Sequence, residues 1–317
     1  MSGICGIVGK IEANLLDRMC DSISHRGMHK STLIKSEVAL GIQLWQVSGV
    51  VPPDSQPARN EQGTIWAVLD GDLYNHDDLY GELESRGHRL RHHCASEILV
   101  HAYEEFGLDC ATRLEGPFAF AIWDDVQRQL VLGRDRLGMQ PLYYAKIQGQ
   151  ILFGSEIKAI LQCEDFERRV NETALWNYLS LLFVPGPETI FQQIYQVEPA
   201  CVLTYHRGQI RTRRYWHLDY RQKIGDSQDA LCERVLSSLR HAVEKLIVSE
   251  VSTSVMLSGG VDAGAVLSLA REVSSRPIHS FTSSVKESSE FVGGDAFPLA
   301  RLTAEHVGSI HHEVLID

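Results

Sequence analysis

The segment of this sequence best suited to chemistry is a short loop near residue 258. An apolar stretch, 252–257, leads into Ser258-Gly259-Gly260-Val261-Asp262, and a helix-prone stretch, 263–270, follows it. A glycine pair between a strand and a helix directs several backbone N–H groups to one point, which also faces the positive end of the helix dipole. Phosphate or pyrophosphate is the ligand that this point favours. Asp262 then suits a Mg²⁺ ion, which binds one or two carboxylates together with phosphate oxygens.

The loop differs from the two common nucleotide-binding motifs. The sequence contains no Gly-x-x-x-x-Gly-Lys-Ser/Thr run at this place and no Gly-x-Gly-x-x-Gly after a strand. The alternative interpretation is an ordinary strand-to-helix turn that uses glycine for a positive φ.

Composition limits the classes of protein. The chain has 317 residues, which suggests two domains, and it is 44% hydrophobic and 22% charged, which indicates a globular protein. A net charge of −11 argues against a nucleic-acid surface. No apolar run approaches the roughly 18 residues of a membrane helix, and the start does not resemble a signal peptide. Seven scattered cysteines without Cys-x-x-Cys spacing predict a reduced, cytoplasmic setting.

The first two thirds of the chain alternate short apolar runs with few helices. Stretches with the composition of strands are Gly3–Val8, Ile65–Asp70, Ala119–Asp124, Gln129–Gly133, Leu142–Lys146, Ile151–Gly154 and Val202–Tyr205. Residues 97–106 carry one apolar stripe at helical spacing, and 173–182 predict a second helix that two prolines end. This mixture favours stacked sheets or an α+β sandwich.

The texture changes after a basic segment, 207–226, which we interpret as a solvated edge strand followed by a linker; a basic binding patch is the alternative. An amphipathic helix, 228–247, follows. Helices and strands then alternate, which predicts a parallel sheet. The predicted strands after the loop are 278–283 and 312–316, and the predicted helices are 263–273 and 297–307. The expected organisation is therefore domain 1–206, linker 207–226 and domain 227–317.

The second domain is short for a parallel sheet, because such sheets usually run to five or six strands covered on both faces. With about three strands, the last one would leave an open apolar edge. We therefore expect a fragment, a split-gene product or a truncated relative, with a homodimer or a partner chain completing the sheet.

Considered together, both halves resemble glutamine-dependent asparagine synthetases. Segments that fit this family occur in its order: Cys5-Gly6-Ile7, His25-Arg26-Gly27, Gln56-Pro57, Asp70-Gly71-Asp72-Leu73-Tyr74-Asn75-His76, Gly133-Arg134-Asp135-Arg136-Leu137-Gly138, Pro141-Leu142-Tyr143-Tyr144, Ser155-Glu156-Ile157-Lys158-Ala159, Arg214-Tyr215-Trp216 and the Ser-Gly-Gly-x-Asp loop. The resemblance implies an αββα sandwich of the N-terminal-nucleophile type that releases ammonia from glutamine. It also implies a truncated α/β pyrophosphatase-loop domain that activates aspartate as an adenylate, with ATP and Mg²⁺ as cofactors.

The resemblance also assigns roles to residues. The ATP-binding positions would be Leu257, Ser258, Gly259, Gly260, Asp262 and Ser283, with Asp262 as the Mg²⁺ ligand. The glutamine-binding positions would be Asp70, Gly71 and Asp72. Cys5 is the candidate nucleophile, whose base in the family is a free α-amine with a pKa near 7.7–8.0.

Several family residues are replaced. The nucleophilic cysteine of the family becomes residue one after methionine removal, whereas Cys5 follows four residues, so it is either trimmed to a terminus or an ordinary buried strand residue. Ser2 at the start of Ser2-Gly3-Ile4 is the alternative nucleophile. Leu44 replaces an arginine that pairs with the glutamine carboxylate, and Asp70 replaces an asparagine that donates to the oxyanion. Ala95 replaces an aspartate that holds the substrate amine. These changes predict a degraded glutaminase pocket.

In the ATP domain the replacements are milder. Ala263 stands where the family usually has serine, and Asp295 matches an acidic family position that is followed here by Ala296 in place of a glutamate. The cluster His88, His92, His93 and Cys94 invites a zinc interpretation, but it lacks a second ligand pair at metal spacing, so we expect a solvated surface. His311 and His312 are expected at the start of a strand.

Three functions stay open. The first is an asparagine synthetase homologue with a degraded glutaminase domain. The second resembles β-lactam synthetases, which keep the ATP domain and adenylate other carboxylates. The third is a non-catalytic pseudoenzyme or assembly subunit.

Overall fold

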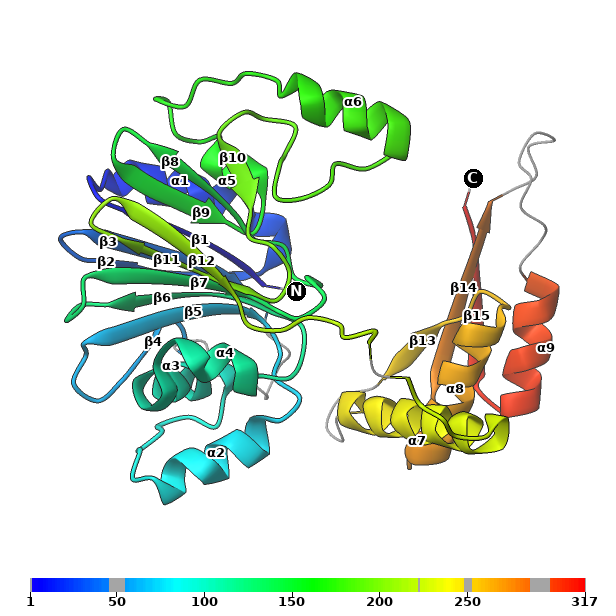
Figure 1. Cartoon of the computed structure of the whole chain (residues 1–317). Helices are drawn as coiled ribbons and strands as arrows, with labels where there is room; N and C mark the ends of the chain where they lie inside the picture. The colour runs from blue at the N-terminus through cyan, green and yellow to red at the C-terminus, as the bar shows by residue number, and fades with distance from the viewer. Residues whose placement is uncertain (1, 46–54, 222, 248–252, 286–296, 317) are drawn as a thin grey trace. The chain divides into compact units, whose positions relative to one another are not determined.

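The computed structural model describes residues 2–45, 55–221, 223–247, 253–285 and 297–316. The chain divides into two compact units, Met1–Asp219 and Tyr220–Asp317 (Figure 1). Asp295 and Ala296 lie outside the described residues.

Two six-stranded antiparallel sheets build the first unit. Sheet A has the order β10-β8-β9-β1-β3-β2, with β1 Gly3–Val8, β2 His29–Ile34, β3 Val38–Leu44, β8 Tyr143–Ile147, β9 Gln150–Gly154 and β10 Ile194–Gln196. Sheet B has the order β12-β11-β7-β6-β5-β4, with β4 Ala58–Arg59, β5 Ile65–Gly71, β6 Phe118–Asp124, β7 Gln129–Arg134, β11 Cys201–His206 and β12 Gln209–Arg214.

Helices cover the outer face of each sheet, so the unit has four layers in the order α, β, β, α (Figure 1). On sheet A lie α1 Ala13–Ser22 and α5 Ile157–Ile160. On sheet B lie α2 His76–Ser85, α3 Ala95–Phe106 and α4 Cys110–Arg113. A third apolar cluster fills the space between the two sheets. The expected αββα sandwich is confirmed.

The sequence of β1 shows why its position is central. Ile4 and Val8 belong to the cluster between the sheets, while Cys5 and Ile7 belong to the cluster under α1 and α5. Successive side chains of a strand point to opposite faces, and both faces of this strand are covered. All six residues of β1 are therefore buried, which explains its continuous apolar sequence.

Most predicted strands and helices are present with ends shifted by one or two residues. Beyond them, the structure contains β2, β3, β4, β10, α1 and α2. It also contains two short 3-10 helices, η1 Ser24–Arg26 and η2 Gly107–Asp109, while α6 Glu172–Leu181 is the helix predicted at 173–182. The outer strand β2 carries mostly exposed or half-buried residues, so its sequence lacks the apolar signal on which strand prediction depends.

The compact first unit extends past residue 206, where the sequence predicted a domain boundary. The basic segment does contain an edge strand, because Gln209–Arg214 pairs along its whole length with β11. Beyond it, the Tyr215 hydroxyl donates to the Arg134 carbonyl at 2.8 Å, and the Tyr215 N–H donates to the Ala200 carbonyl at 2.8 Å. These contacts extend the first unit to Asp219.

The second unit contains a parallel sheet of order β13-β14-β15 within the described residues, as predicted. The strands are β13 Ser254–Met256, β14 His279–Val285 and β15 Ile310–Ile316, and the helices are α7 Gln228–Leu246, α8 Val261–Val273 and α9 Phe297–Val307. Its main apolar cluster joins residues of α8 and α9 to Leu257 and Ile278. No helix in the described part of the chain combines the length and the apolar character that a bilayer span requires.

The packing around β1 makes a first prediction. A Cβ atom at Gly6 would lie against the Phe153 ring and 2.5 Å from the Ala39 carbonyl oxygen, whereas one at Gly81 on α2 would meet nothing within 4 Å. We expect Gly6→Ala to lower the free energy of unfolding by about 1–3 kcal/mol through overpacking. Gly81→Ala, the matched control, should raise it by about 0.5–1 kcal/mol, since alanine favours a helix interior. Denaturant titration followed by tryptophan fluorescence reports the first unit, which holds all five tryptophans. Equal stability of the two variants would contradict this account of the packing.

Candidate functional site

A buried charge network lies beside the start of β1, and its centre is Arg26 at the end of η1. Its guanidinium is 3.1 Å from Asp70 Oδ2 and 3.3 Å from Glu156 Oε1, and its Nε donates to the Ser2 carbonyl at 2.8 Å. Asp70 belongs to β5 of sheet B, whereas Ser2 and Glu156 flank β1 and β9 of sheet A. One side chain therefore links the two sheets at this edge.

Asp70 has no exposed surface. Its Oδ2 accepts from the Ser155 hydroxyl at 3.2 Å as well as from Arg26, while its Oδ1 has no hydrogen-bond partner among the described residues. Burial raises the pKa of Asp70 to about 6, although Arg26 and Ser155 favour the ionised form. An ionised carboxylate only accepts hydrogen bonds, so Asp70 is not suited to stabilise an oxyanion.

Glu156 closes the exposed side of the network. His25 Nε2 is 2.6 Å from its Oε1, and Lys158 Nζ is 3.0 Å from its Oε2. Partial burial opposes ionisation, but the hydrogen bonds from Lys158 and His25 hold the pKa of Glu156 below its usual range. The network thus places an anionic group next to the cationic Arg26.

Cys5 does not lie in this network. Its side chain has no exposed surface, packs in the cluster under α1, and has its Sγ 3.4 Å from Cys20 Sγ. The contact with Cys20, together with burial, raises the pKa of the Cys5 thiol well above its ordinary value. A protonated thiol inside the core is a poor nucleophile, so the geometry does not support Cys5 in that role.

Ser2, the alternative nucleophile, lies beside the charge network. Its carbonyl contacts Arg26, and its Oγ accepts from the Trp45 N–H at 3.1 Å. The Ile4 N–H donates to Ser155 Oγ at 2.9 Å, which ties the start of β1 to the Asp70 contact. The alternative based on Ser2-Gly3-Ile4 therefore agrees better with the fold than Cys5 does.

The other predicted glutamine-site residues surround the end of β5. Gly71 has φ +121°, and a Cβ there would collide with the Pro117 carbonyl. Asp72 is exposed, and its Oδ1 accepts from the Leu73 N–H at 2.9 Å. This turn needs glycine for its conformation. Sequence reasoning quoted Arg26, Ser155 and Glu156 within motifs but gave them no roles.

The predicted phosphate loop lies at the carboxyl edge of the parallel sheet. Leu257 is buried and its N–H donates to the Phe281 carbonyl at 2.8 Å. Gly259 has φ +79°, and Gly260 precedes α8 as its N-cap without a side-chain cap in the described structure. Backbone N–H groups at the start of this helix, which has 13 residues, are suited to an anion, and that of Gly260 donates to Ser258 Oγ at 3.4 Å.

Asp262 and Ser283 lie at the same edge. Asp262 is exposed in the first turn of α8. β13 pairs with β14 in parallel up to Met256 opposite Phe281, and extending that register by two residues puts Ser258 opposite Ser283. Ser283 is exposed. The loop and the acidic residue thus follow β13, and the serine lies on the neighbouring strand β14.

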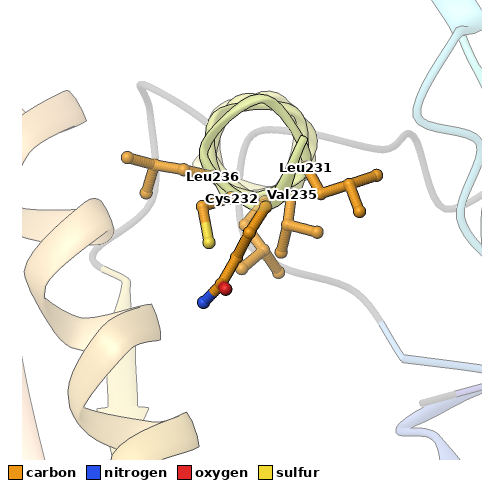
Figure 2. Close-up of a pocket in the computed structure, with 6 residues that line it drawn as sticks. Leu231, Cys232, Val235 and Leu236 are labelled. Atoms are coloured by element: carbon orange, nitrogen blue, oxygen red, sulfur yellow. The ribbon is translucent and has the colours of Figure 1, made fainter. Parts of the chain in front are cut away.

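Two concave surfaces lie in the second unit. One has a volume of about 410 Å³ between α7, β13 and α8, and Asp262 is among its lining residues. The other, of about 350 Å³, lies along α7 and is lined by Gln228, Leu231, Cys232, Val235, Leu236 and Leu239. Figure 2 shows four of these side chains on one side of the helix. Both linings are mainly apolar, and of the predicted nucleotide-binding residues only Asp262 lines one of them.

The expectation of a solvated histidine cluster needs correction. Only 12% of the His88 side chain is exposed, and Cys94 is buried. His93 lies on the surface, and His92 is half-buried. The two residues at 311 and 312 lie near the start of β15, as expected.

Comparisons with known proteins agree with this architecture. Residues 1–216 match the model of the glutamine amidotransferase domain family, and residues 234–317 match that of asparagine synthase. Asparagine synthetase [glutamine-hydrolyzing] 3 of Bacillus subtilis is 33% identical over 99% of this chain and 54% of its own length. The chain belongs to the glutamine amidotransferase domain family, and its residues 234–317 are similar to asparagine synthase.

Two further similarities are informative. Amidase chry2 of Gibberella zeae is 30% identical over 95% of this chain and 47% of its own length. The chain thus spans about half the length of these curated relatives. Glutamine phosphoribosylpyrophosphate amidotransferase from B. subtilis superposes with a TM-score of 0.52, at 13% identity, over 99% of this chain and 90% of that one. At that identity the similarity concerns the fold alone.

The family positions that are replaced have their own structural environments. Leu44 ends β3 with its side chain in the apolar cluster between the sheets, where no substrate carboxylate would find a charge partner. Ala95 begins α3 and packs against the cluster on sheet B.

The buried Asp70 carboxylate predicts a pH effect on stability. Its pKa in the folded protein, about 6, lies above its ordinary value of 3.8. Between these values the folded state binds more protons than the unfolded state, so the free energy of unfolding falls as pH rises from 4 to 6 and then levels off. The expected fall is on the order of 3 kcal/mol.

We expect Asp70→Asn to flatten this part of the profile, because the amide does not titrate. Asp78→Asn on exposed α2 is the control and should keep the wild-type slope. Denaturant titrations by tryptophan fluorescence at several pH values between 4 and 8 measure both. If the free energy of unfolding of Asp70→Asn falls with pH as steeply as that of the wild type, Asp70 is not the group responsible for the fall.

Proposed function

We propose that this chain acts in an ATP-dependent ligase reaction of the asparagine synthetase kind, in which aspartate is activated as an adenylate and then amidated. The observation that carries the proposal is the uncapped start of α8 behind Gly259-Gly260, with Asp262 beside it at the carboxyl edge of a parallel sheet. Ligands of open α/β sheets bind at this edge. The names of the relatives support aspartate as the acceptor.

The described residues fit a nucleotide and its metal ion. Backbone N–H groups at Gly260 and in the first turn of α8 would hold pyrophosphate oxygens, and Gly259 allows the chain its positive φ there. Asp262, exposed and next to these groups, would hold Mg²⁺. The ion neutralises charge on the leaving pyrophosphate when it is bound. The exposed Ser283 hydroxyl would contact the nucleotide from the neighbouring strand.

We further propose that the first unit does not hydrolyse glutamine. Arg26 is already engaged by Asp70, Glu156 and the Ser2 carbonyl, so it offers little to a substrate carboxylate. The acceptor-only Asp70 stands where an oxyanion donor is needed, and removing one such donor typically costs a factor of about 10²–10³ in rate. Ammonia would then come from solution or from another protein.

A second candidate keeps the ATP site and changes the acceptor, as in proteins that resemble β-lactam synthetases. The buried ion pair in place of a glutamine site favours it, since such an enzyme has no need of glutamine-derived ammonia. One relative carries the name of an amidase and not of an asparagine synthetase. A pseudoenzyme or an assembly subunit, as a homodimer or with a partner chain, is supported by the half-exposed Val314, Leu315 and Ile316 on the edge strand.

The nucleotide site predicts a specific loss on substitution. Asp262→Asn should raise the Kd for Mg-ATP by about tenfold or more, because the amide is a weaker Mg²⁺ ligand than the carboxylate. In the presence of a chelator, the wild type and Asp262→Asn should bind ATP with equal Kd. Asp229→Asn, an exposed first-turn acid on α7, is the matched control. Isothermal titration calorimetry measures all three, and an unchanged Kd for Asp262→Asn would remove Asp262 from the site.

The glutaminase proposal is tested by product formation. The chain incubated with glutamine should release no more glutamate than Ser2→Ala, because neither protein has a functional oxyanion donor or a free substrate-binding arginine. Coupled detection of glutamate measures the rate. Turnover that Ser2→Ala abolishes would instead identify Ser2 as a working nucleophile and disprove the proposal.

A further inference from the structure

Three potential metal ligands converge on the outer face of sheet B. His88 follows α2, whereas His101 and Glu104 lie one turn apart on α3. The two Nδ1 atoms are 3.2 Å apart, and Glu104 Oε2 is 3.5 Å from that of His88 and 3.4 Å from that of His101. His101 is 1% exposed, so its Nδ1 is fixed by packing inside the unit and points at the other two atoms.

These separations match a tetrahedral metal site. With metal–ligand distances of about 2.0–2.1 Å, neighbouring ligands of a tetrahedral zinc ion lie about 3.3–3.4 Å apart. The three measured edges are 3.2, 3.4 and 3.5 Å. Two imidazoles with one carboxylate form a donor set that zinc favours.

The surroundings orient each ligand. Glu105 Oε2 is 3.2 Å from His88 Nε2, and Asn60 Nδ2 donates to Glu104 Oε1 at 3.1 Å. Glu61 Oε2 lies 4.0 Å from His101 Nδ1, and its other oxygen accepts from the Arg89 N–H at 3.1 Å. In zinc sites, the ligand residues typically form such hydrogen bonds to neighbouring groups, above all from the second ring nitrogen of a histidine ligand to a carboxylate.

Without a cation, these contacts place two hydrogen-bond acceptors close to each other. A hydrogen bond from His88 Nε2 to Glu105 uses the single N–H of a neutral imidazole, which leaves a lone pair on Nδ1. That lone pair can accept from His101 Nδ1–H at 3.2 Å, but the Glu104 oxygen, which is also an acceptor, then lies 3.5 Å from it without a donor between them. A cation between them turns the repulsion into coordination.

We propose that His88 Nδ1, His101 Nδ1 and Glu104 Oε2 bind one structural Zn²⁺ ion, with the fourth position filled by Glu61 or water. The ion would fasten the chain after α2 and the turn after β4 to α3. This site lies within the first unit and does not depend on the nucleotide loop. Another group, His76, Asp77 and His93, also has ligand atoms within 4.8 Å of one another, but its side chains are 41–76% exposed, so it lacks the packing that fixes a site.

Zinc content and zinc titration of the whole chain test the proposal. After treatment with a chelator, the chain should take up one Zn²⁺ from zinc chloride, and its Tm should rise by about 5–10 °C at a hundredfold excess over the Kd. Co²⁺ in place of zinc should give the visible absorption of tetrahedral coordination. Glu104→Gln and His88→Ala should weaken binding by more than about 100-fold, since even outer partners contribute 10–100-fold.

His93→Ala is the matched control, because it removes a nearby surface histidine and should leave zinc binding unchanged. Far-ultraviolet circular dichroism establishes whether each variant folds; if His88→Ala does not, Glu104→Gln and the Co²⁺ spectrum decide. Absence of zinc binding by the wild type, equal binding by Glu104→Gln, or loss of binding in His93→Ala would each overturn the proposal.

Discussion

The covering of both faces of both sheets is the constraint on which the first unit depends. Strands such as β1 must be apolar on every residue, since each side chain enters either the cluster between the sheets or the cluster under a helix layer. A polar group that reaches this interior therefore needs a partner. Arg26 and Asp70 satisfy each other across the two sheets, and Ser155 and the Ser2 carbonyl take up further hydrogen bonds. The charges at the candidate site are consequently part of the structure that joins the sheets.

In the proposed function, the same charge network that stabilises the fold does not form a glutaminase pocket. A glutaminase pocket needs polar groups that are free to form hydrogen bonds with the substrate. In the described charge network, only the buried Asp70 Oδ1 atom has no hydrogen-bond partner. Asp70 Oδ1 can only accept a hydrogen bond when the carboxyl group is ionised, and burial already raises the pKa of this group to about 6. The carboxylate would repel another anion, so Asp70 disfavours an oxyanion at the same position. The αββα fold does not by itself imply glutamine hydrolysis, because function depends on the side chains that a fold presents.

The sequence predicted the interior strands and the phosphate loop because their signals are local. Apolar runs mark the central strands, and the loop consists of consecutive residues between β13 and α8. Edge strands such as β2 were missed because their residues are exposed or half-buried, so the sequence lacks an apolar run. The charge network could not be derived, because Arg26 meets Asp70 and Glu156 from 44 and 130 residues away. Of the two expectations for Cys5, the structure agrees with the buried strand residue, because strand alternation sends its side chain under α1. His101 was overlooked as a partner of His88, because only the packing of α3 brings the two together.

The two halves differ in how much substitution their sites tolerate. The proposed phosphate site would be made of backbone N–H groups at a helix start, so a change such as alanine at position 263 would remove a hydroxyl and leave the helix dipole and the donors in place. The glutamine site would be made of side chains, and each replacement there removes a charge or inverts a hydrogen-bonding role. At Asp70 the effect extends further, because a carboxylate attracts the neighbouring guanidinium and so withdraws a second group from any ligand. The proposed loss of glutamine hydrolysis beside a retained nucleotide site would therefore follow from the chemistry of the groups that build each site.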